Sequence, residues 1–489
     1  MSKTIIIIGA GLAGLSAALQ AAENGCNVKL VSSFPSERAQ SVMAEGGINA
    51  ALNTKDENDS PEEHFTDTIK AACGLADPNA VWGMTQAAPE LVHWLLKLGV
   101  QFNMSGYDDV DLRNFGGQKK KRTAFAQSDT GKQIMTAMID AVRRKEASGM
   151  VERFSHHSFL TLRLCDNICC GCVIRDEYSQ ETVELPGDAV IVATGGMHGL
   201  FGNTTGSLSN TGEVTAELFR LGVPLANGEM IQYHPTTVKC GGKRMLISEA
   251  ARGEGGRLFA MKDGKQWYFM EEKYPELGNL MPRDITAREI WKVSHESEVF
   301  LDMTEISDEI ISNKLSGLAD DCMTYLHKDI RKEPVSVLPG IHYFMGGILV
   351  DEQHRTPIQN LYAAGECCAQ YHGANRLGGN SLLGALYGGC VAAKSACEQA
   401  DVVDLSCATQ IDFPPASQIS EIKQLNKVMQ ETMGVVRNEN TLLNGIQTVQ
   451  ALTGNLPLLG MAVLKSALAR KESRGAHWRE DYPKSNDDD

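Results

Sequence analysis

The sequence predicts an α/β fold, because one short pattern, an apolar strand followed by a glycine turn, occurs three times along the 489 residues. The first copy is residues 4–14, the second is 188–196 and the third is 360–366. Each apolar run has the length of a buried strand, and the first leads into helical periodicity at residues 12–24. Buried strands that lead directly into helices are typical of α/β proteins.

The first copy has the spacing of a dinucleotide-binding turn. Gly9 permits the tight turn, Gly11 lets phosphates approach the backbone, and Gly14 lets the helix pack on the sheet. The helix N-terminus would then face a pyrophosphate. The next strand, residues 28–31, ends at Ser32 and Ser33, where a carboxylate for the ribose hydroxyls is expected. The pattern predicts a Rossmann-like domain, and a strand–helix turn without a ligand is the alternative.

The second and third copies indicate that the dinucleotide is FAD. FAD is long, and a fold that binds it extended needs several such close approaches of the backbone. In the third copy, Glu366 directly follows a glycine turn and is a candidate contact for a ribose or ribityl hydroxyl. Its alternative role is an ordinary solvated loop carboxylate.

The rest of the chain divides into segments with different hydrophobic periodicity and glycine content. Helical periodicity occurs at residues 62–72, 79–98, 130–146 and 383–400, and residues 158–186 alternate as antiparallel strands. Residues 34–60 are polar and contain glycine, which predicts a long loop. From about 235 to 340 the strand–glycine pattern stops, which indicates an inserted domain. Residues 417–472 are helical and amphipathic.

Composition and charge narrow the classes of partner. The chain has 46 Lys and Arg against 61 Asp and Glu, and this net charge of −15 argues against nucleic acid or an anionic membrane surface as the main partner. Because we find no apolar stretch of bilayer length and no secretory signal, we expect a cytoplasmic protein without a direct membrane span.

Its 13 cysteines are expected to be reduced. A metal site at Cys165, Cys169, Cys170 and Cys172 is an alternative to buried thiols, but the spacing fits neither zinc nor a ferredoxin cluster, so we predict no metal.

Further motifs, in their order along residues 4 to about 483, resemble the flavoprotein subunits of succinate dehydrogenase and fumarate reductase. These motifs are Ala44-Glu45-Gly46-Gly47, Phe115-Gly116-Gly117, Gln232-Tyr233-His234-Pro235-Thr236, Ser248-Glu249-Ala250-Ala251-Arg252-Gly253-Glu254-Gly255-Gly256, Pro282-Arg283-Asp284, His342-Tyr343-Phe344-Met345-Gly346-Gly347, Gly373-Ala374-Asn375-Arg376-Leu377-Gly378-Gly379-Asn380-Ser381 and Glu472-Ser473-Arg474-Gly475-Ala476-His477.

The resemblance implies a Rossmann-like FAD-binding domain in two segments, residues 1–234 and 345–410. An α+β capping domain, residues 235–344, is inserted between them, and a C-terminal helical domain with a tail covers 411–489. Ser32 agrees with the resemblance, because a serine there is similar to some family members. The expected FAD contacts are Gly9, Ala10, Gly11, Ala13, Gly14, Ser32, Ser33, Arg38, Ser41, Ala44, Glu45, Gly46, Gly47, Ala193, Thr194, Gly195, Gly365, Glu366, Arg376, Asn380, Ser381 and Leu382.

The implied substrate is a small dicarboxylate, fumarate or succinate, bound between the cap and the flavin. Arg376 can clamp one carboxylate with two hydrogen bonds. His234, His342 and Ser248 can bind the other, and Phe115 is also expected at the substrate. Taken singly, each histidine could be a satisfied core residue, and Arg376 could bind only an FAD phosphate.

Arg283 is the implied proton donor for the reduction of the alkene. A guanidinium holds its proton tightly, so this role requires a strongly basic carbanion and a relay that restores the proton. Glu249 and Arg252 match the relay of the family and lie three residues apart, on one face of a helical turn. As an isolated pair, Arg283 and Asp284 could equally be a surface ion pair.

Gln40 stands where many relatives carry the histidine that is covalently linked to FAD. Glutamine cannot form that bond, so we predict non-covalent FAD. In the family, the covalent bond raises the flavin potential and supports succinate oxidation. Its absence favours the reduction of fumarate, or of a similar activated alkene, over the succinate dehydrogenase direction.

Two alternatives of different kinds stay open. L-aspartate oxidase needs an acid for the substrate ammonium, and Phe115 stands at that position here. A catalytically silent flavoprotein scaffold would not need Arg283, Glu249 and Arg252.

No cluster or haem motif is present, so electrons are expected from an iron–sulfur partner subunit or from a diffusible donor. The chain stops soon after Pro483, unlike many complex-bound relatives, so we do not expect a standard four-subunit membrane complex. Partner subunits could still hold the chain at the surface of a membrane.

Overall fold

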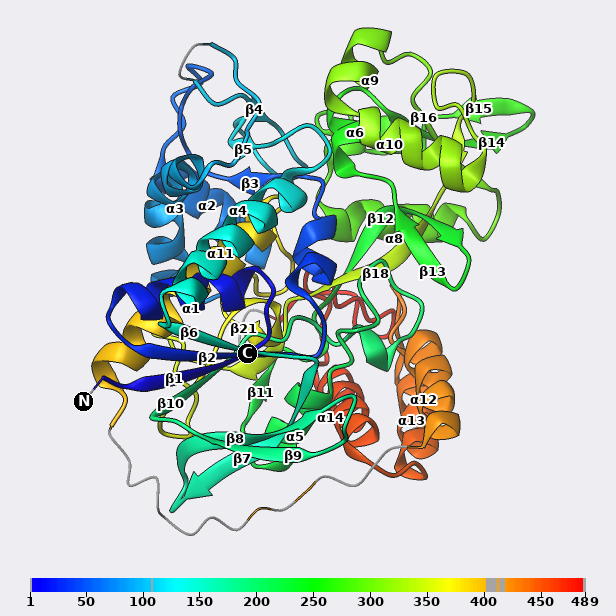
Figure 1. Cartoon of the computed structure of the whole chain (residues 1–489). Coiled ribbons are helices and arrows are strands. Elements are labelled where there is room, and N and C mark those ends of the chain that lie inside the picture. The colour runs from blue at the N-terminus through cyan, green and yellow to red at the C-terminus, as the bar shows by residue number, and fades with distance from the viewer. Residues whose placement is uncertain (1, 107–108, 402–410, 412, 414–417, 487–489) are drawn as a thin grey trace.

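The computed structural model describes residues 2–106, 109–401, 411, 413 and 418–486. Its centre is a five-stranded parallel sheet with the order β20-β10-β1-β2-β6 (Figure 1). The strands are β1 (Thr4–Ile8), β2 (Asn27–Ser32), β6 (Val151–Ser155), β10 (Ala189–Val192) and β20 (Leu361–Ala363). The predicted Rossmann-like domain in two segments is confirmed, because β20 comes from the second segment and completes the sheet of the first.

Successive residues of β1 face opposite layers, as the two-residue period of a strand requires. Ile5 and Ile7 pack into the apolar cluster of the helical layer, whereas Ile6 and Ile8 pack against a second, antiparallel sheet. The helical layer contains α1 (Leu12–Glu23), α2 (Pro61–Ala72), α3 (Pro78–Leu98), α4 (Thr130–Ala147) and α11 (Asn380–Gln399). The antiparallel sheet contains β7 (His157–Cys165), β8 (Ile168–Asp176) and β9 (Thr182–Pro186), with β8 in the middle.

The predicted helices at 12–24, 62–72, 79–98 and 130–146 are confirmed to within one residue at each end. Helix α11 begins before the predicted residue 383, because Gly379, with φ of 84°, provides the left-handed turn that starts it. The predicted long loop at 34–60 is wrong in part. It contains the 3₁₀ helices η1 (Ser36–Arg38) and η2 (Gln40–Met43) and strand β3 (Ile48–Asn49), which joins β4 (Leu112–Arg113) and β5 (Thr123–Ala124) in a small sheet.

The inserted α+β cap rises beside the central sheet, in green at the upper right of Figure 1. Its apolar cluster runs from Ile247 to Val337 and also takes in Phe115 from the first segment. One sheet has the order β13-β12-β18 and the other has β15-β14-β16-β17. The cap strands are β12 (Ile231–Cys240), β13 (Lys243–Leu246), β14 (Arg257–Lys262), β15 (Lys265–Trp267), β16 (Val299–Asp302), β17 (Val335–Ser336) and β18 (Leu338–Phe344).

The cap helices are short, and α8 is the longest of them. They are α6 (Glu249–Gly253), α7 (Phe269–Lys273), α8 (Arg283–Val293), α9 (Asp308–Lys314) and α10 (Ser316–Asp321), with η4 (Gly278–Leu280) and the π-helix η5 (Cys322–Leu326). The proposed domain boundary at 234 falls within β12, and the one at 344 falls at the end of β18. These two paired strands therefore run from the nucleotide-binding domain into the cap.

Smaller elements complete the second segment and the C-terminal part. A sheet with the order β11-β19-β21 contains β11 (Leu225–Ala226), β19 (Gly347–Leu349) and β21 (Cys368–Ala369), and α5 (Glu213–Arg220) and η6 (Gly365–Cys367) contact β19. The 3₁₀ helix η3 (His198–Leu200) precedes α5 in the chain. The C-terminal helices, confirmed as predicted, are α12 (Ile419–Thr432), α13 (Glu439–Gln450) and α14 (Asn455–Ala469). After α14 the chain returns to the centre, where the backbone N–H of Ala476 donates to Ala374 O at 2.9 Å. The proposed boundary at 410 lies outside the described residues.

The described residues also bear on membrane and cysteine expectations. Within them, no helix combines the length and hydrophobicity needed to cross a bilayer. Cys169, Cys170 and Cys172 are free and lie buried in β8. Cys165 is disulfide-bonded, so the expectation that every cysteine is reduced is wrong at that residue.

Candidate active site

A cleft of about 560 Å³ lies between the nucleotide-binding domain and the cap. Nearly all the residues expected to contact FAD or substrate line it. Three of the expected residues do not line the cleft but lie directly behind the residues that do. Gly14 faces the turn of the first strand, Arg252 lies behind Glu249, and the Asn380 side chain is engaged with Asn49 and Thr68.

The glycine turn after β1 forms one end of the cleft, where the phosphates of FAD are expected. Gly9 has φ of +112°, and a side chain there would overlap Ala193 O from the second strand–glycine copy. A side chain at Gly14 would overlap Gly9 O in the same way. Gly11 is the N-cap of α1, and the next backbone N–H, of Leu12, donates to Ser41 Oγ at 3.2 Å. This end therefore offers backbone and the N-terminus of a helix, as a pyrophosphate requires.

Ser32 and Ser33 line the part of the cleft where the nucleoside of FAD is expected. Ser32 Oγ is buried and has no hydrogen-bond partner among the described residues. Ser33 Oγ lies 3.3 Å from Ser158 Oγ and 3.4 Å from His157 O. An unpartnered buried hydroxyl is costly, and a ribose hydroxyl would satisfy it. These residues therefore fit the adenosine part of FAD.

The segment from Ala44 to Gly47 borders the middle of the cleft. Arg113 holds it from behind, with Nε donating to Gly46 O at 2.9 Å and Nη2 donating to Glu45 O at 3.1 Å. Burial, together with Asp321, raises the pKa of Glu45 to about 8. Its Oε2 has no hydrogen-bond partner in the part of the chain that the structure describes. Glu45 is therefore a largely protonated carboxyl group that faces the cleft at neutral pH.

Glu366 lies on the opposite side of this region. Its Oε1 accepts a hydrogen bond from the Phe344 backbone N–H at 3.1 Å. Burial raises the pKa of Glu366 to about 7. A carboxyl group on the cleft wall fits the expected role as acceptor for a ribityl or ribose hydroxyl.

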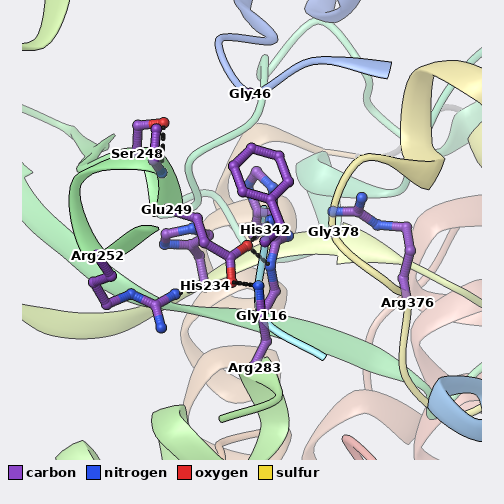
Figure 2. Close-up of polar contacts among 12 residues, drawn as sticks. Gly46, Gly116, His234, Ser248, Glu249, Arg252, Arg283, His342, Arg376 and Gly378 are labelled. Atoms are coloured by element: carbon purple, nitrogen blue, oxygen red, sulfur yellow. Dashed lines mark hydrogen bonds and ion pairs between the residues drawn. The ribbon is translucent and has the colours of Figure 1, made fainter. Parts of the chain in front are cut away.

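Glu249 is the centre of a buried ionic cluster (Figure 2). Its Oε2 accepts from Arg283 Nε at 2.8 Å and from Arg283 Nη2 at 2.6 Å. Its Oε1 accepts from Arg252 Nη2 and from the Gly116 backbone N–H, both at 3.2 Å. Burial alone would raise the pKa of Glu249, but Arg283 and Arg252 outweigh it and hold the pKa below its ordinary value. The structure thus brings together the three predicted residues of the proton path.

Gln232, which the sequence reasoning did not single out, joins the two arginines that face the cleft. Its Oε1 accepts from Arg283 Nη1 and from Arg376 Nη2, each at 3.0 Å. Its Nε2 donates to Asn375 Oδ1 at 3.0 Å and to Arg376 O at 2.8 Å. The available signal was its place two residues before His234 in the same motif, on the strand β12.

Arg376 is buried and lacks an acidic partner among the described residues. No ion pair joins it to a carboxylate there, and its Nε has no hydrogen-bond partner. The guanidinium lies 4.2 Å from the centre of the Tyr343 ring. Burial and the neighbouring Arg283 lower the pKa of Arg376 to about 9. A buried cation with an unpaired donor is unfavourable alone, so this site is suited to an anion.

Two histidines lie side by side in the cleft, with 5.2 Å between the ring centres of His234 and His342. Burial lowers the pKa of both well below the usual value, and Arg283 contributes for each. His342 Nδ1 lies 2.8 Å from the hydroxyl of Thr205, a second residue that sequence reasoning missed. Ser248 Oγ accepts from the Ala250 N–H at 3.4 Å as the N-cap of α6. The imidazoles are therefore neutral, oriented hydrogen-bonding groups.

Phe115 is packed rather than exposed, with a relative accessibility of 2%. Side chains at Gly46 or Gly378 would press against its ring. The ring therefore forms an apolar wall next to Glu249, between the central cleft segment and the loop that carries Arg376. Its position would place a phenyl group, not a charge, beside a bound substrate.

The set as a whole can bind a small dianion and move a proton. It combines two cleft-facing guanidinium groups, two neutral imidazoles and one hydroxyl. Glu249 is already neutralised by Arg283 and Arg252, so its charge does not repel an anion strongly. Within the described residues, no group of three or more His, Cys, Asp or Glu side chains could hold a metal ion.

Comparison with known proteins identifies the family. Residues 4–382 match the model of an FAD binding domain, and residues 453–489 match the model of the fumarate reductase flavoprotein C-terminal region. The succinate dehydrogenase flavoprotein subunit of Bacillus subtilis is 39% identical, with 100% of this chain and 92% of that protein covered. L-aspartate oxidase of Pyrococcus furiosus is 33% identical, with 99% and 97% covered. The 8-methylmenaquinol:fumarate reductase flavoprotein subunit of Wolinella succinogenes is 32% identical, with 99% and 87% covered.

Solved structures agree. A point mutant of the E. coli quinol fumarate reductase flavoprotein superposes with a TM-score of 0.89 at 27% identity, covering 100% of this chain and 93% of that one. Mycobacterium smegmatis Sdh1 superposes with a TM-score of 0.84 at 29% identity, covering 99% and 90%. With these matches over its whole length, and with a cleft suited to FAD, the chain belongs to the family of succinate dehydrogenase and fumarate reductase flavoproteins and is an FAD-dependent oxidoreductase.

Proposed function

We propose that this chain is the flavoprotein subunit of a fumarate reductase. The observation that carries the proposal is the pair Arg283 and Arg376, which share the Gln232 oxygen and face one cleft. Arg376 has no acidic partner among the described residues, so a substrate carboxylate would complete its pairing. When bound, FAD supplies a hydride to one alkene carbon, and the other carbon receives a proton, which gives succinate.

The proposed roles of the residues follow from their contacts. Arg376 clamps one substrate carboxylate. His234, His342 and Ser248 bind the other carboxylate and turn the double bond towards the flavin site. As negative charge builds on the attacked substrate, these fixed donors stabilise it without rearranging. Phe115 excludes water from that side of the cleft.

Arg283 is proposed to donate the proton from its cleft-facing guanidinium. Two of its nitrogens already donate to Glu249, which holds the group in place. Glu249, an ionised carboxylate, can then take a proton from Arg252 and pass it to Arg283, and Arg252 regains its proton from bulk water. Arg252 Nη1 also donates to Asn279 O at 2.6 Å, which fixes the end of this path. The three residues thus form one continuous chain of hydrogen bonds.

Gln40 supports a dissociable FAD. It lines the cleft, and its Oε1 accepts from the Ser207 backbone N–H at 2.6 Å. An amide cannot form a histidyl–flavin bond, so we propose non-covalent FAD and, with it, fumarate reduction as the cellular direction. Acid precipitation tests this: free FAD should stay in the supernatant. Flavin in the pellet would contradict it.

Electrons are proposed to come from an iron–sulfur partner subunit, which would also place the chain at a membrane surface through its partners. The W. succinogenes relative is named as one subunit of an 8-methylmenaquinol:fumarate reductase, which supports this assignment. Affinity purification of the tagged chain from its own cells should bring down a protein with an iron–sulfur absorption spectrum. A chain that purifies alone and accepts electrons from a soluble donor would contradict it.

The deciding experiment mixes the purified, reduced holoprotein with fumarate or succinate, and the oxidised holoprotein with aspartate, in an anaerobic stopped-flow instrument. We expect fumarate to reoxidise the flavin rapidly, while succinate does not. Reduction of the oxidised flavin by aspartate would instead favour an L-aspartate oxidase, a function that the P. furiosus relative carries in its name. Rapid reoxidation by another activated alkene, with fumarate inert, would overturn the substrate assignment.

A further inference from the structure

His198 is a buried imidazole behind the cleft wall that the proposed mechanism does not use. Its relative accessibility is 0%, and its Nε2 has no hydrogen-bond partner among the described residues. That nitrogen lies 3.8 Å from Glu366 Oε1. The ring is held at its edges: Phe344 meets it edge-on at 5.0 Å between ring centres, and Gly206 leaves no space for a side chain beside it.

Thr204 contacts the other ring nitrogen of His198, Nδ1. Its Oγ1 lies 3.0 Å from His198 Nδ1 and accepts the Gly206 backbone N–H at 3.2 Å. Within the described residues, His198 Nδ1 is the acceptor available to the Thr204 hydroxyl. In the tautomer in which Nδ1 accepts from this hydroxyl, the hydrogen of a neutral ring is on Nε2, which lies 3.8 Å from Glu366 Oε1. Burial, with Lys243 nearby, lowers the pKa of His198 to about 3, so the ring is neutral at physiological pH.

Adjacent threonines therefore orient two histidines with different surroundings. Thr204 contacts His198 beside Glu366, and Thr205 contacts His342 in the substrate part of the cleft. Glu366 lines the cleft and already accepts from the Phe344 N–H. A shift of about 1 Å by the flexible carboxylate would bring His198 Nε2 within hydrogen-bond distance. A second fixed donor would keep Glu366 ionised and aimed at hydroxyl groups in the cleft.

We propose that His198 is a positioning residue for FAD: its Nε2–H holds Glu366 as the carboxylate acceptor for a hydroxyl of the cofactor. This rests on the proposed assignment of Glu366 to FAD and on a dissociable cofactor. His198 itself acts through Glu366 and does not touch the substrate. It contributes to how tightly the holoprotein keeps FAD, not to the proton path.

Two substitutions separate the nitrogens of the ring. His198→Gln places an amide nitrogen near the position of Nε2, while His198→Asn places one near Nδ1 and is too short to reach Glu366. FAD release from diluted holoprotein is followed by the fluorescence of the free cofactor. We expect His198→Asn to release FAD about tenfold faster than wild type, as for loss of one hydrogen bond to a charged group, and His198→Gln to stay within about threefold.

A double-mutant cycle with Glu366→Gln tests the route of the effect. If His198 acts through Glu366, His198→Asn should have no further effect in the Glu366→Gln protein. Equal release from the Asn and Gln variants, or additive effects in the double variant, would overturn the proposal. Flavin that stays with denatured wild-type protein would overturn it together with the non-covalent proposal. The fumarate assignment is judged separately by the stopped-flow experiment, because FAD release does not depend on the substrate.

Discussion

The two halves of the cleft are lined by different groups, one mainly by backbone and the other mainly by side chains. The cofactor half, where we propose that FAD binds, is largely backbone: the turn at Gly9, the close contact of Gly14 with Gly9 O, and a second strand–glycine unit at Ala193. The substrate half is made of side chains, with Arg283, Gln232 and Arg376 linked through one amide oxygen. Backbone groups can approach a polyphosphate without adding charge, whereas a dianion that leaves water needs cations. Binding in the cofactor half should therefore be lost when a side chain is added to the backbone turn. Binding in the substrate half should be lost when a specific hydrogen-bond donor is removed.

The largest expected effect is in the substrate half. Arg283→Gln keeps a donor but cannot deliver a proton, so fumarate turnover should fall about a thousandfold, as for loss of a general acid. FAD content should stay at the wild-type level. Arg283→Lys, which keeps an acidic hydrogen but loses the double contact with Glu249, should retain more activity. Steady-state turnover with a chemical reductant measures both variants, and wild-type turnover in Arg283→Gln would exclude this residue as the donor.

The cofactor half should respond to one methyl group. Gly14→Ala adds a Cβ that overlaps Gly9 O, so the turn must shift and we expect FAD affinity to fall about a hundredfold or the holoprotein not to form. Gly242→Ala is the matched control, because a Cβ there meets nothing within 4 Å and its φ is not in the left-handed region. The flavin-to-protein absorbance ratio and FAD titration report the difference. If both variants bound FAD alike, close backbone packing would not be what the turn requires.

A smaller effect is expected at the boundary between the halves. Ser248→Ala removes one proposed substrate donor and the N-cap of α6, so the KM for fumarate should rise about tenfold, with a smaller fall in kcat. Ser248→Thr restores the hydroxyl and should return KM close to that of wild type. Thermal unfolding of both variants separates the loss of the cap from the loss of the donor. A KM that does not respond to either change would remove Ser248 from the substrate site.

The smallest expected effect is a pH dependence. Burial and Asp321 raise the pKa of Glu45 to about 8, so its carboxyl group is neutral below that pH and negative above it. The new charge would oppose a dianionic substrate, so apparent fumarate affinity should fall roughly fivefold as pH rises from about 7 to about 9. Glu45→Gln should remove the part of this fall that is centred near pH 8 and leave the part near pH 9, where Arg376 begins to lose its charge. A fall centred near pH 8 that persists in Glu45→Gln would assign the titration to another group.

The same contrast explains what the sequence could predict. The cofactor half follows from short contiguous patterns, such as the apolar run 4–8 with its glycines, because strand, turn and helix are local. The joining of Arg283 with Glu249 was expected only through resemblance to a family. Gln232, Thr205 and His198 were missed, since each acts through a partner distant in sequence and has no local pattern. Tertiary packing, not propensity, decides where such side chains point.

The order of the central sheet has a consequence for synthesis of the chain. β1 gains β2 as a neighbour soon after both leave the ribosome, but β10, which pairs with the other edge of β1, follows much later, and β20 later still. At roughly ten residues per second, β10 emerges on the order of twenty seconds after β1. During that interval one edge of an isoleucine-rich strand has no partner and can pair with other nascent chains. We therefore expect the yield of folded protein to rise when cells grow at a lower temperature or contain more chaperones. Added FAD should do little for a nascent chain that does not yet include Glu366.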